Sequence, residues 1–352
     1  MKKHRVLIVD DSVVVRRILS VQLAKEEDIE VAGVAANGKI ALAMMTQVNP
    51  DILILDVHMS EMDGLTLLKE LRQKSFSVPV IMLSSSTQKS AEITLEALAL
   101  GANDYVAKPE FTKGLDDAVG KVCAELAEKI RLFCTKSLLE APSSTVAHAT
   151  PRIDFSSALP QLVLIGVSTG GPTALSEVIP AISADFPVPI ALVQHMPAMF
   201  TKMLAERLTA SSKIRVIEAQ GGEILKPGNA YLAPGGYHLI LERQKADLVT
   251  CLTQTPPVNS CRPSVDVLFE SAAPLMGSKV LAIVLTGMGE DGKRGCEAIA
   301  DRGGFIIAQD EATSVVWGMP GAVVKAELAD RILPLRHIAA AIEQYCRKGF
   351  TK

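Results

Sequence analysis

The chain has 352 residues, of which 48% are hydrophobic and 21% charged, with a formal net charge of −3. This length favours two domains, each large enough to bury its own core, and the composition is typical of globular α/β proteins. The near-neutral charge argues against a nucleic-acid-binding protein, and no apolar run reaches the roughly 18 residues of a membrane span. The six cysteines form no pair at metal-ligand spacing, and Asp10 and Asp11 interrupt the apolar start. We therefore expect reduced thiols in a cytoplasmic protein without an export signal or direct membrane insertion.

Strand-length apolar runs alternate with helical patterns over residues 1–126, where 14 Lys and Arg stand against 18 Asp and Glu. Short connections between these elements imply a parallel sheet with helices on both faces. The expected strands are, in chain order, Arg5–Val9, Ile29–Ala35, Asp51–Leu55, Val78–Leu83 and Asp104–Val106.

Polar side chains follow four of these strands. Asp10 and Asp11 end the first strand, Asp56 the third, Ser84 the fourth and Lys108 the fifth. In an open parallel sheet these carboxyl ends share one edge, which is where ligands bind. Three carboxylates there would repel one another without a cation, and hard oxygen ligands suit Mg²⁺. A carboxylate beside Mg²⁺ and a lysine is suited to attack phosphorus and form an aspartyl phosphate.

On these residues, the segment 1–126 resembles the receiver domain of a two-component response regulator. The resemblance implies that Asp56 is the phosphoacceptor and that Asp10 and Asp11 support Mg²⁺. It also implies that the backbone carbonyl of His58 completes the metal shell. A flavodoxin-like, doubly wound fold is therefore expected for this part of the chain.

The same resemblance implies three residues that respond to the phosphoryl group. Ser84 would be the switch hydroxyl, Tyr105 the rotating aromatic and Lys108 the phosphate-binding lysine. The sequence departs from many receivers at Ser60, where proline is common. This departure affects the rigidity of the loop more than its chemistry.

The periodic pattern fails from about Phe133 to Pro160, where proline, serine, threonine and alanine predominate. Such composition is typical of a linker. We therefore expect a receiver domain over residues 1–126, a linker over 127–158 that includes the end of the last receiver helix, and a second domain over 159–352.

The second domain opens with the apolar run 162–167 and the Gly-x-Ser-x-Gly pattern around Ser168. Pro172 in the first turn of the next helix supports a strand–turn–helix unit. Such a turn raises the serine hydroxyl clear of the sheet and aims backbone N–H groups at its target. On the motif alone, the alternative is a glycine turn in which the serine only caps the helix.

Further strands are expected at Val188–Gln194, Val280–Leu285 and 303–310, and residues 228–241 suggest strands joined by a turn. His195 follows the first of these strands, and Asp291 follows the second. A second doubly wound, Rossmann-like α/β domain would bring both to the sheet edge that carries the serine.

Ser168, His195 and Asp291 are therefore candidates for nucleophile, general base and orienting acid. Their chain order differs from the Ser, Asp, His order of α/β-hydrolases, so that superfamily is not assigned. His238 and Asp266 are rivals for the base and the acid. They rank lower because neither clearly follows a central buried strand.

From Leu162 almost to its C-terminus, the chain resembles the catalytic domain of the chemotaxis protein-glutamate methylesterases. The shared motifs are GVSTGG, QHMP, LAPGGYH, RPSVD, LTGMG followed by DG, and WGMPG. The resemblance implies that Ser168, His195 and Asp291 form the catalytic triad, with Thr169 assisting. It also implies that the Met288 backbone N–H contributes to the oxyanion hole, without a metal or other cofactor in the esterase site.

A receiver ahead of this domain is that family's architecture. It implies a phosphorylation-regulated serine esterase that hydrolyses glutamyl methyl esters on methyl-accepting chemotaxis receptors and deamidates receptor glutamines. The implied phosphodonor is the chemotaxis histidine kinase, and we expect a monomer. The rival hypothesis is a response regulator whose second domain only binds a partner, with the glycine-rich turn as an anion or nucleotide site. The absence of a G-x-G-x-x-G pattern weakens it.

Overall fold

The computed structural model describes residues 3–85, 87–108, 115–136 and 159–348. The chain divides into two compact units, residues 1–143 and 144–352, which are described separately. The last receiver helix runs to Lys136, so it enters the segment expected as linker. The rest of that segment, residues 137–158, lies outside the described residues. Within the described residues, no helix is long and apolar enough to span a membrane.

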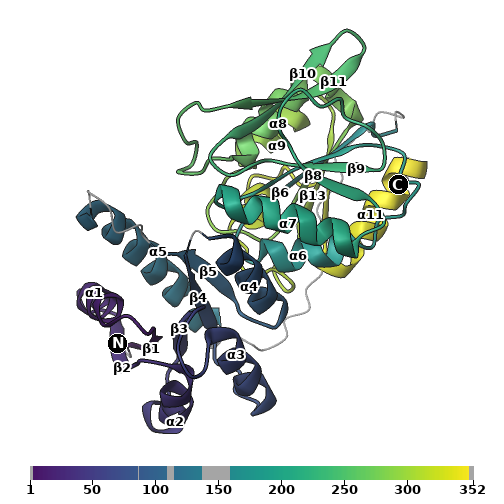
Figure 1. Cartoon of the computed structure of the whole chain (residues 1–352). Helices are drawn as coiled ribbons and strands as arrows, with labels where there is room; N and C mark the ends of the chain where they lie inside the picture. The colour runs from purple at the N-terminus through teal and green to yellow at the C-terminus, as the bar shows by residue number, and fades with distance from the viewer. Residues whose placement is uncertain (1–2, 86, 109–114, 137–158, 349–352) are drawn as a thin grey trace. The chain divides into compact units, whose positions relative to one another are not determined.

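The first unit is a five-stranded parallel sheet with the strand order β2-β1-β3-β4-β5 (Figure 1). Residues of β1, β3 and β4 are almost entirely buried because helices cover both faces, as the apolar runs predict. The strands are β1 His4–Val9, β2 Ile29–Ala35, β3 Ile52–Asp56, β4 Val80–Ser84 and β5 Asp104–Ala107. The helices are α1 Val13–Leu23, α2 Gly38–Val48, α3 Gly64–Gln73, α4 Gln88–Ala99 and α5 Leu115–Lys136.

Four of these helices begin at a polar residue whose side chain accepts a hydrogen bond from the first turn. This bond satisfies a backbone N–H that would otherwise have no partner in the helix. The capping residues are Ser12, Asn37, Asp63 and Thr87. Capping therefore fixes where each helix starts after its strand, and so fixes the short loops at the carboxyl edge.

The second unit contains a seven-stranded parallel sheet with the order β14-β13-β12-β6-β7-β9-β8. Its strands are β6 Leu162–Val167, β7 Ile190–Gln194, β8 Arg215–Glu218, β9 Asn229–Leu232, β12 Val280–Val284, β13 Phe305–Gln309 and β14 Arg331–Leu333. The helices are α6 Gly171–Val178, α7 Ala198–Ser211, α8 Val265–Met276, α9 Lys293–Ala300, α10 Met319–Lys325 and α11 Leu335–Lys348, with a short 3₁₀ turn at Gly277–Lys279. The expected doubly wound α/β architecture is confirmed for both units.

An antiparallel hairpin, β10 His238–Gln244 and β11 Asp247–Thr253, stands apart from this sheet and packs on α8. The expectation of strands joined by a turn in residues 228–241 is confirmed. The two strands there, β9 and β10, belong to different sheets and do not pair with each other. Local pattern revealed the strands, whereas the choice of pairing partner depends on long-range contacts.

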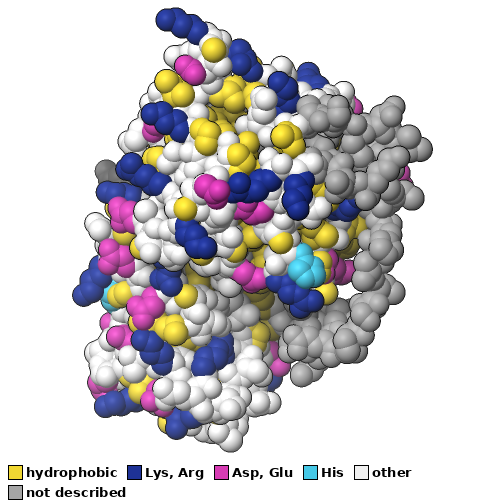
Figure 2. Space-filling model, turned by 90° about the vertical axis from the view of Figure 1, so that its right-hand side faces the viewer, with side chains coloured by type: hydrophobic (Ala, Val, Ile, Leu, Met, Phe, Trp, Pro, Cys, Tyr) yellow, Lys and Arg dark blue, Asp and Glu magenta, His cyan; other side chains and the backbone are white. Residues whose placement is uncertain are grey.

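Acidic and basic side chains are interspersed on the face drawn in Figure 2. A mixed surface of this kind agrees with the small net charge of the sequence. It offers no evidence for the basic stripe that nucleic-acid binding requires.

Candidate functional sites

The carboxyl edge of the first sheet holds a compact group of charged side chains. Lys108 Nζ lies 2.8 Å from Asp10 Oδ2 and 2.8 Å from Asp56 Oδ2. Oxygen atoms of Asp10, Asp11 and Asp56 lie within 4.8 Å of one another. Asp10 and Asp56 are buried, whereas Asp11 is exposed to solvent. The three carboxylates that the sequence placed at strand ends therefore do come together beside the lysine.

Burial and charge set the protonation of this group. Burial raises the pKa of Asp56 above its usual value, although the Lys108 ammonium opposes that shift. For Lys108, burial lowers the pKa, but the neighbouring Asp56 and Asp10 carboxylates outweigh burial and raise it. The three converging carboxylates form a set of hard oxygen donors that fits Mg²⁺, with the partly buried Lys108 beside them. Their mutual repulsion is the physical reason a divalent cation would bind there.

Ser84 and Tyr105 lie on the neighbouring strands, and both are buried. The Ser84 hydroxyl accepts a hydrogen bond of 2.8 Å from Thr94 of α4, so this helix is linked directly to the end of β4. The Tyr105 backbone carbonyl accepts a 2.7 Å bond from Lys129 of α5. His58 Nε2 is 2.9 Å from Ser90 Oγ at the start of α4. Ser84 and His58 thus link α4 to the acidic edge, whereas Tyr105 is linked to α5.

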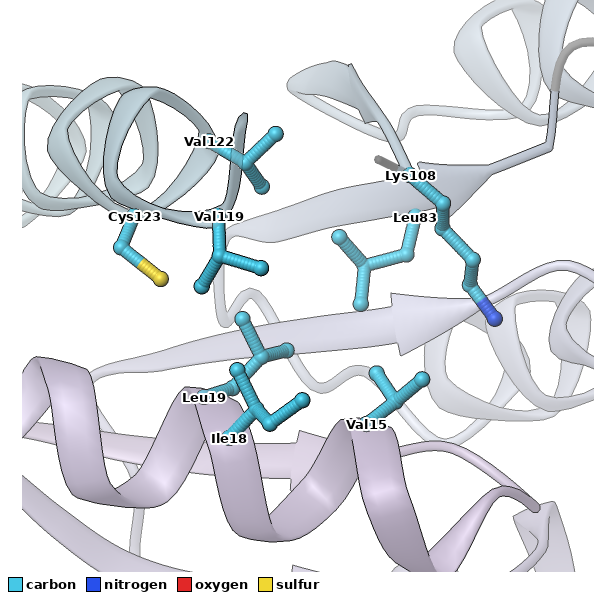
Figure 3. Close-up of a pocket in the computed structure, with 8 residues that line it drawn as sticks. All are labelled: Val15, Ile18, Leu19, Leu83, Lys108, Val119, Val122 and Cys123. Atoms are coloured by element: carbon cyan, nitrogen blue, oxygen red, sulfur yellow. The ribbon is translucent and has the colours of Figure 1, made fainter. Parts of the chain in front are cut away.

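An apolar cavity lies between α1 and α5, directly beneath this site (Figure 3). The aliphatic stem of Lys108 forms one wall of it, so only the ammonium end reaches the carboxylates. The other lining residues are Val15, Ile18, Leu19, Leu83, Val119, Val122 and Cys123. This apolar surrounding keeps water away from the stem and strengthens the ion pairs at its tip.

In the second unit, Ser168 occupies the predicted turn between β6 and α6. Its backbone N–H donates to the Thr286 carbonyl (3.0 Å), and its carbonyl accepts from Gly171 N (2.8 Å) and Gln194 Nε2 (3.0 Å). Gly170, with φ of 76°, supplies the left-handed turn that precedes the helix. At Gly287, an added Cβ would lie 2.8 Å from the Ser168 Cβ, so glycine is needed beside the serine. Ser168 is half-buried, and its backbone makes hydrogen bonds with three other residues.

His195 follows β7 and pairs with Asp291, with Nε2 and Oδ2 2.8 Å apart. The other ring nitrogen, Nδ1, lies 3.5 Å from Cys261 Sγ. Burial alone lowers the pKa of His195, but the hydrogen bonds to Asp291 and Cys261 outweigh it and raise the pKa to about 9. Burial likewise opposes ionisation of Asp291, yet the bond to His195 holds the pKa of that carboxyl far below its usual value. Both shifts favour the imidazolium–carboxylate form of the pair.

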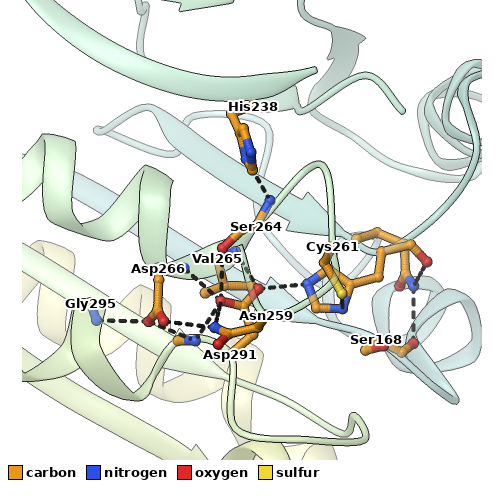
Figure 4. Close-up of polar contacts among 12 residues, drawn as sticks. Ser168, His238, Asn259, Cys261, Ser264, Val265, Asp266, Asp291 and Gly295 are labelled. Carbon is orange, nitrogen blue, oxygen red and sulfur yellow. Dashed lines mark hydrogen bonds and ion pairs between the residues drawn. The ribbon is translucent and has the colours of Figure 1, made fainter. Parts of the chain in front are cut away.

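Asp291 is surrounded by donors from one segment, residues 259–266 (Figure 4). The backbone N–H groups of Val265 (2.7 Å) and Asp266 (3.1 Å) reach its two oxygens. The Ser264 hydroxyl donates at 2.8 Å, and the Asn259 amide donates at 2.9 Å. Such a shell keeps a buried carboxylate ionised and fixes its direction.

The sequence reasoning missed Asn259 and Cys261, and it assigned no role to Ser264 of the RPSVD motif. In this part of the chain only the RPSVD motif at residues 262–266 stood out, because the residues before it have no apolar periodicity. The turn of positive-φ residues at Asn259 and Ser260 could have been suspected from the Asn-Ser pair. Nothing in the sequence shows that this turn lies against the strand end that carries His195.

His238 and Asp266, the rival candidates for the base and the acid, form hydrogen bonds with other residues and not with each other or with His195. His238 is fully buried, with Nδ1 accepting a 3.2 Å bond from Ser264 N and Nε2 3.2 Å from the Pro256 carbonyl. Asp266 accepts from Gly292 N (2.9 Å) and Gly295 N (2.8 Å) and thereby caps α9. The carboxylate that bonds to His195 is Asp291.

Thr169 and Met288 flank the serine turn. Thr169 is buried, and its carbonyl accepts a 2.9 Å bond from Thr286 Oγ1. Met288 follows Gly287, whose own N–H donates to the Val316 carbonyl (3.0 Å). The loop after β12 is therefore fixed against the serine turn.

Two family models match the chain, the response regulator receiver domain over residues 6–119 and the CheB methylesterase over residues 163–342. A protein-glutamate methylesterase/protein-glutamine glutaminase of Trichodesmium erythraeum is 50% identical over 348 residues, or 97% of this chain and 99% of that protein. A protein of the same description from Nocardioides is 45% identical over 349 residues, 96% of this chain and 94% of its own length.

The crystal structure of the Thermotoga maritima CheB methylesterase catalytic domain is also similar. It is 43% identical, covers 53% of this chain and 99% of its own, and gives a TM-score of 0.52. The likeness to that domain and the full-length match to the two relatives lead to one conclusion. The chain belongs to the CheB methylesterase family and carries a response regulator receiver domain ahead of the methylesterase domain.

Proposed function

We propose that this protein is a phosphorylation-regulated serine esterase that hydrolyses glutamyl methyl esters on methyl-accepting chemotaxis receptors and deamidates receptor glutamines. The observation that carries the proposal is the 2.8 Å His195–Asp291 pair at the strand edge that also presents Ser168. The names of its full-length relatives supply the substrate class. The protein would restore negative charge on the receptors during sensory adaptation.

In the proposed reaction, Ser168 Oγ attacks the ester carbonyl while neutral His195 takes the hydroxyl proton. The Met288 N–H would stabilise the oxyanion, with Thr169 assisting, and methanol leaves with the proton held by His195. Water then hydrolyses the acyl-enzyme by the same route and regenerates Ser168. With a glutamine side chain, ammonia leaves in place of methanol. Asp291 orients the ring and stabilises its charged form, because its carboxylate bonds to Nε2. In this proposal Nδ1, which lies 3.5 Å from Cys261 Sγ, would exchange that contact for one with the serine hydroxyl.

For the receiver, we propose that Asp56 takes a phosphoryl group from the chemotaxis histidine kinase. Mg²⁺ held by Asp10, Asp11, Asp56 and the His58 backbone carbonyl would neutralise charge on that incoming group. Lys108 would bind the new phosphoryl oxygens.

The response to phosphorylation would start from two buried side chains. The Ser84 hydroxyl would bind the phosphoryl group and so alter its present bond to Thr94. Tyr105 would change rotamer in response. The Ser84–Thr94 bond gives this proposal a physical route, because it links the acidic edge directly to α4.

We further propose a cytoplasmic monomer that meets its receptors without inserting into the membrane. Its parts would be a receiver over residues 1–126, a linker over 127–158 and a catalytic domain over 159–352. The two compact units, 1–143 and 144–352, support this division.

The test is release of methanol from methylated receptor membranes by the full-length chain, by Ser168→Ala and by Ser176→Ala. Ser176 is an exposed serine of α6 and serves as the matched control. The proposal expects release by the wild type and the control, but not by Ser168→Ala. A chain that binds the membranes without releasing methanol would favour the binding-module alternative.

A further inference from the structure

A tight turn at residues 258–261 lies beside the His195–Asp291 pair. Val258 and Cys261 exchange two backbone hydrogen bonds, of 3.1 and 2.9 Å. The two residues between them have φ values of 51° at Asn259 and 62° at Ser260. Positive φ at both central positions defines a type I′ turn, in which asparagine is favoured. The backbone of the turn therefore presents the Asn259 side chain on one side and Cys261 towards His195 Nδ1.

The Asn259 amide reaches two carboxylates at once (Figure 4). Its Nδ2 lies 2.9 Å from Asp291 Oδ1 and 2.9 Å from Asp266 Oδ2. An amide nitrogen carries two hydrogens, so one can go to each carboxylate. Asp266 and Asp291 are buried, with 1% and 2% exposure, whereas Asn259 itself is exposed. The amide thus closes the carboxylate pair from the solvent side.

Asp266 is the fixed end of this arrangement. Its Oδ1 accepts from Gly292 N (2.9 Å) and Gly295 N (2.8 Å) at the start of α9, and its own residue lies in the first turn of α8. Burial raises the pKa of Asp266, and the nearby Asp291 charge raises it further. Asn259 is the donor shared by both carboxylates, so its amide offsets the repulsion between these like charges in a buried site.

We propose that Asn259 is a positioning residue of the esterase site, which holds Asp291 in line with His195 by tying it to the anchored Asp266. This proposal rests on the proposed function, in which Asp291 orients the catalytic histidine. Asn259 would act through Asp291 and would not touch the substrate. Its loss should lower kcat and leave KM unchanged.

The test compares Asn259→Gly with Ser260→Gly in the full-length chain, measured by methanol release from methylated receptor membranes. Glycine accepts positive φ at either position, so both variants keep the turn while only the first loses the amide. Hydrogen bonds to charged groups of this kind correspond to a loss of about tenfold to a hundredfold in kcat. Ser260→Gly should be close to wild type. Asn259→Asp should be worse than Asn259→Gly, because it adds a third carboxylate to the pair.

A double-mutant cycle separates positioning from general loop stability. In an Asp291→Asn background, Asn259→Gly should change kcat by less than about twofold, because the group it positions is already gone. Equal losses in both backgrounds, or a loss confined to KM, would overturn the proposal. A melting temperature within a few degrees of wild type confirms that each variant is folded. If Asn259→Gly does not fold, Asn259→Ser replaces it in the cycle. An active Ser168→Ala chain would instead refute the proposed function, whatever the cycle shows.

Discussion

The two candidate sites occupy the same place in two parallel sheets, yet they are built differently. In the receiver, Asp10, Asp56 and Lys108 stand at the ends of β1, β3 and β5 and contact one another directly. In the esterase unit, the strand ends supply Ser168 and His195, but Asp291 lies in the loop after β12. A segment distant in sequence, residues 259–266, then holds that carboxylate. The receiver site follows from strand order, whereas the esterase site also depends on a loop.

The difference has a chemical reason. A metal and phosphoryl site needs several charges gathered at one point, and parallel strand ends provide this without further support. Acyl transfer needs a base held at a defined angle, so the carboxylate that orients the base must itself be oriented. Positioning residues such as Asn259 are therefore expected around Asp291 and have less reason to occur around Asp56.

The largest effect is expected at Ser168. Ser168→Ala should lower turnover by about 10⁶-fold, since loss of a triad serine removes the nucleophile itself. Methanol release measures this directly, and melting temperature checks the fold. Near-normal release by a folded variant would remove Ser168 from the mechanism.

Asp291→Asn should lower kcat by about 10⁴-fold, because the amide favours the wrong histidine tautomer and withdraws the charge beside the imidazolium. The corresponding change at Asp266, Asp266→Asn, should cost much less, since Asp266 has no bond to His195. Comparable losses in the two variants would mean that the orienting acid is misassigned.

Regulation is expected to change activity by up to about a hundredfold, the range over which a two-state equilibrium shifts from 1:99 to 99:1. A small phosphodonor with Mg²⁺ should label Asp56 and stimulate the intact chain, and Asp56→Asn should abolish both effects but keep the basal activity. We expect the unphosphorylated receiver to restrain the esterase domain, so a chain beginning at Pro151 should have high activity that the phosphodonor does not change. If the intact and shortened chains have equal activity and neither responds to the phosphodonor, the receiver only localises the enzyme. If the phosphoryl label on the intact chain is stable in acid, Asp56 is not the phosphoacceptor.

The smallest expected effect, over a single pH unit, is the pH dependence. Serine attack needs neutral imidazole, and a raised pKa keeps His195 protonated to higher pH. kcat/KM should therefore rise about tenfold per pH unit below a midpoint near pH 9. Removing Asp291 should move the midpoint down, because the carboxylate stabilises the imidazolium. A wild-type midpoint near 6.5 would show that the charge pair does not persist in solution.

The polar residues at strand ends were enough to predict the charged group of Asp10, Asp11, Asp56 and Lys108 in the receiver. Apolar runs alternating with helical patterns identify parallel strands, and the carboxyl ends of such strands share one edge of the sheet. The same reasoning anticipated the neighbourhood of His195 and Asp291. Their roles in catalysis remain a prediction. The strands expected in residues 228–241 are present, but local pattern does not say that β9 joins the main sheet and β10 a separate hairpin.

By itself, the sequence determined two α/β domains, the family and the residue types at each strand end. Only the tertiary structure decided which histidine and which carboxylate pair, with His195 bonding to Asp291 while His238 and Asp266 bond elsewhere. It also decided that Asn259 lies against the carboxylates. Residue spacing encodes local geometry, but contacts between a loop and a distant strand end depend on how the buried elements pack.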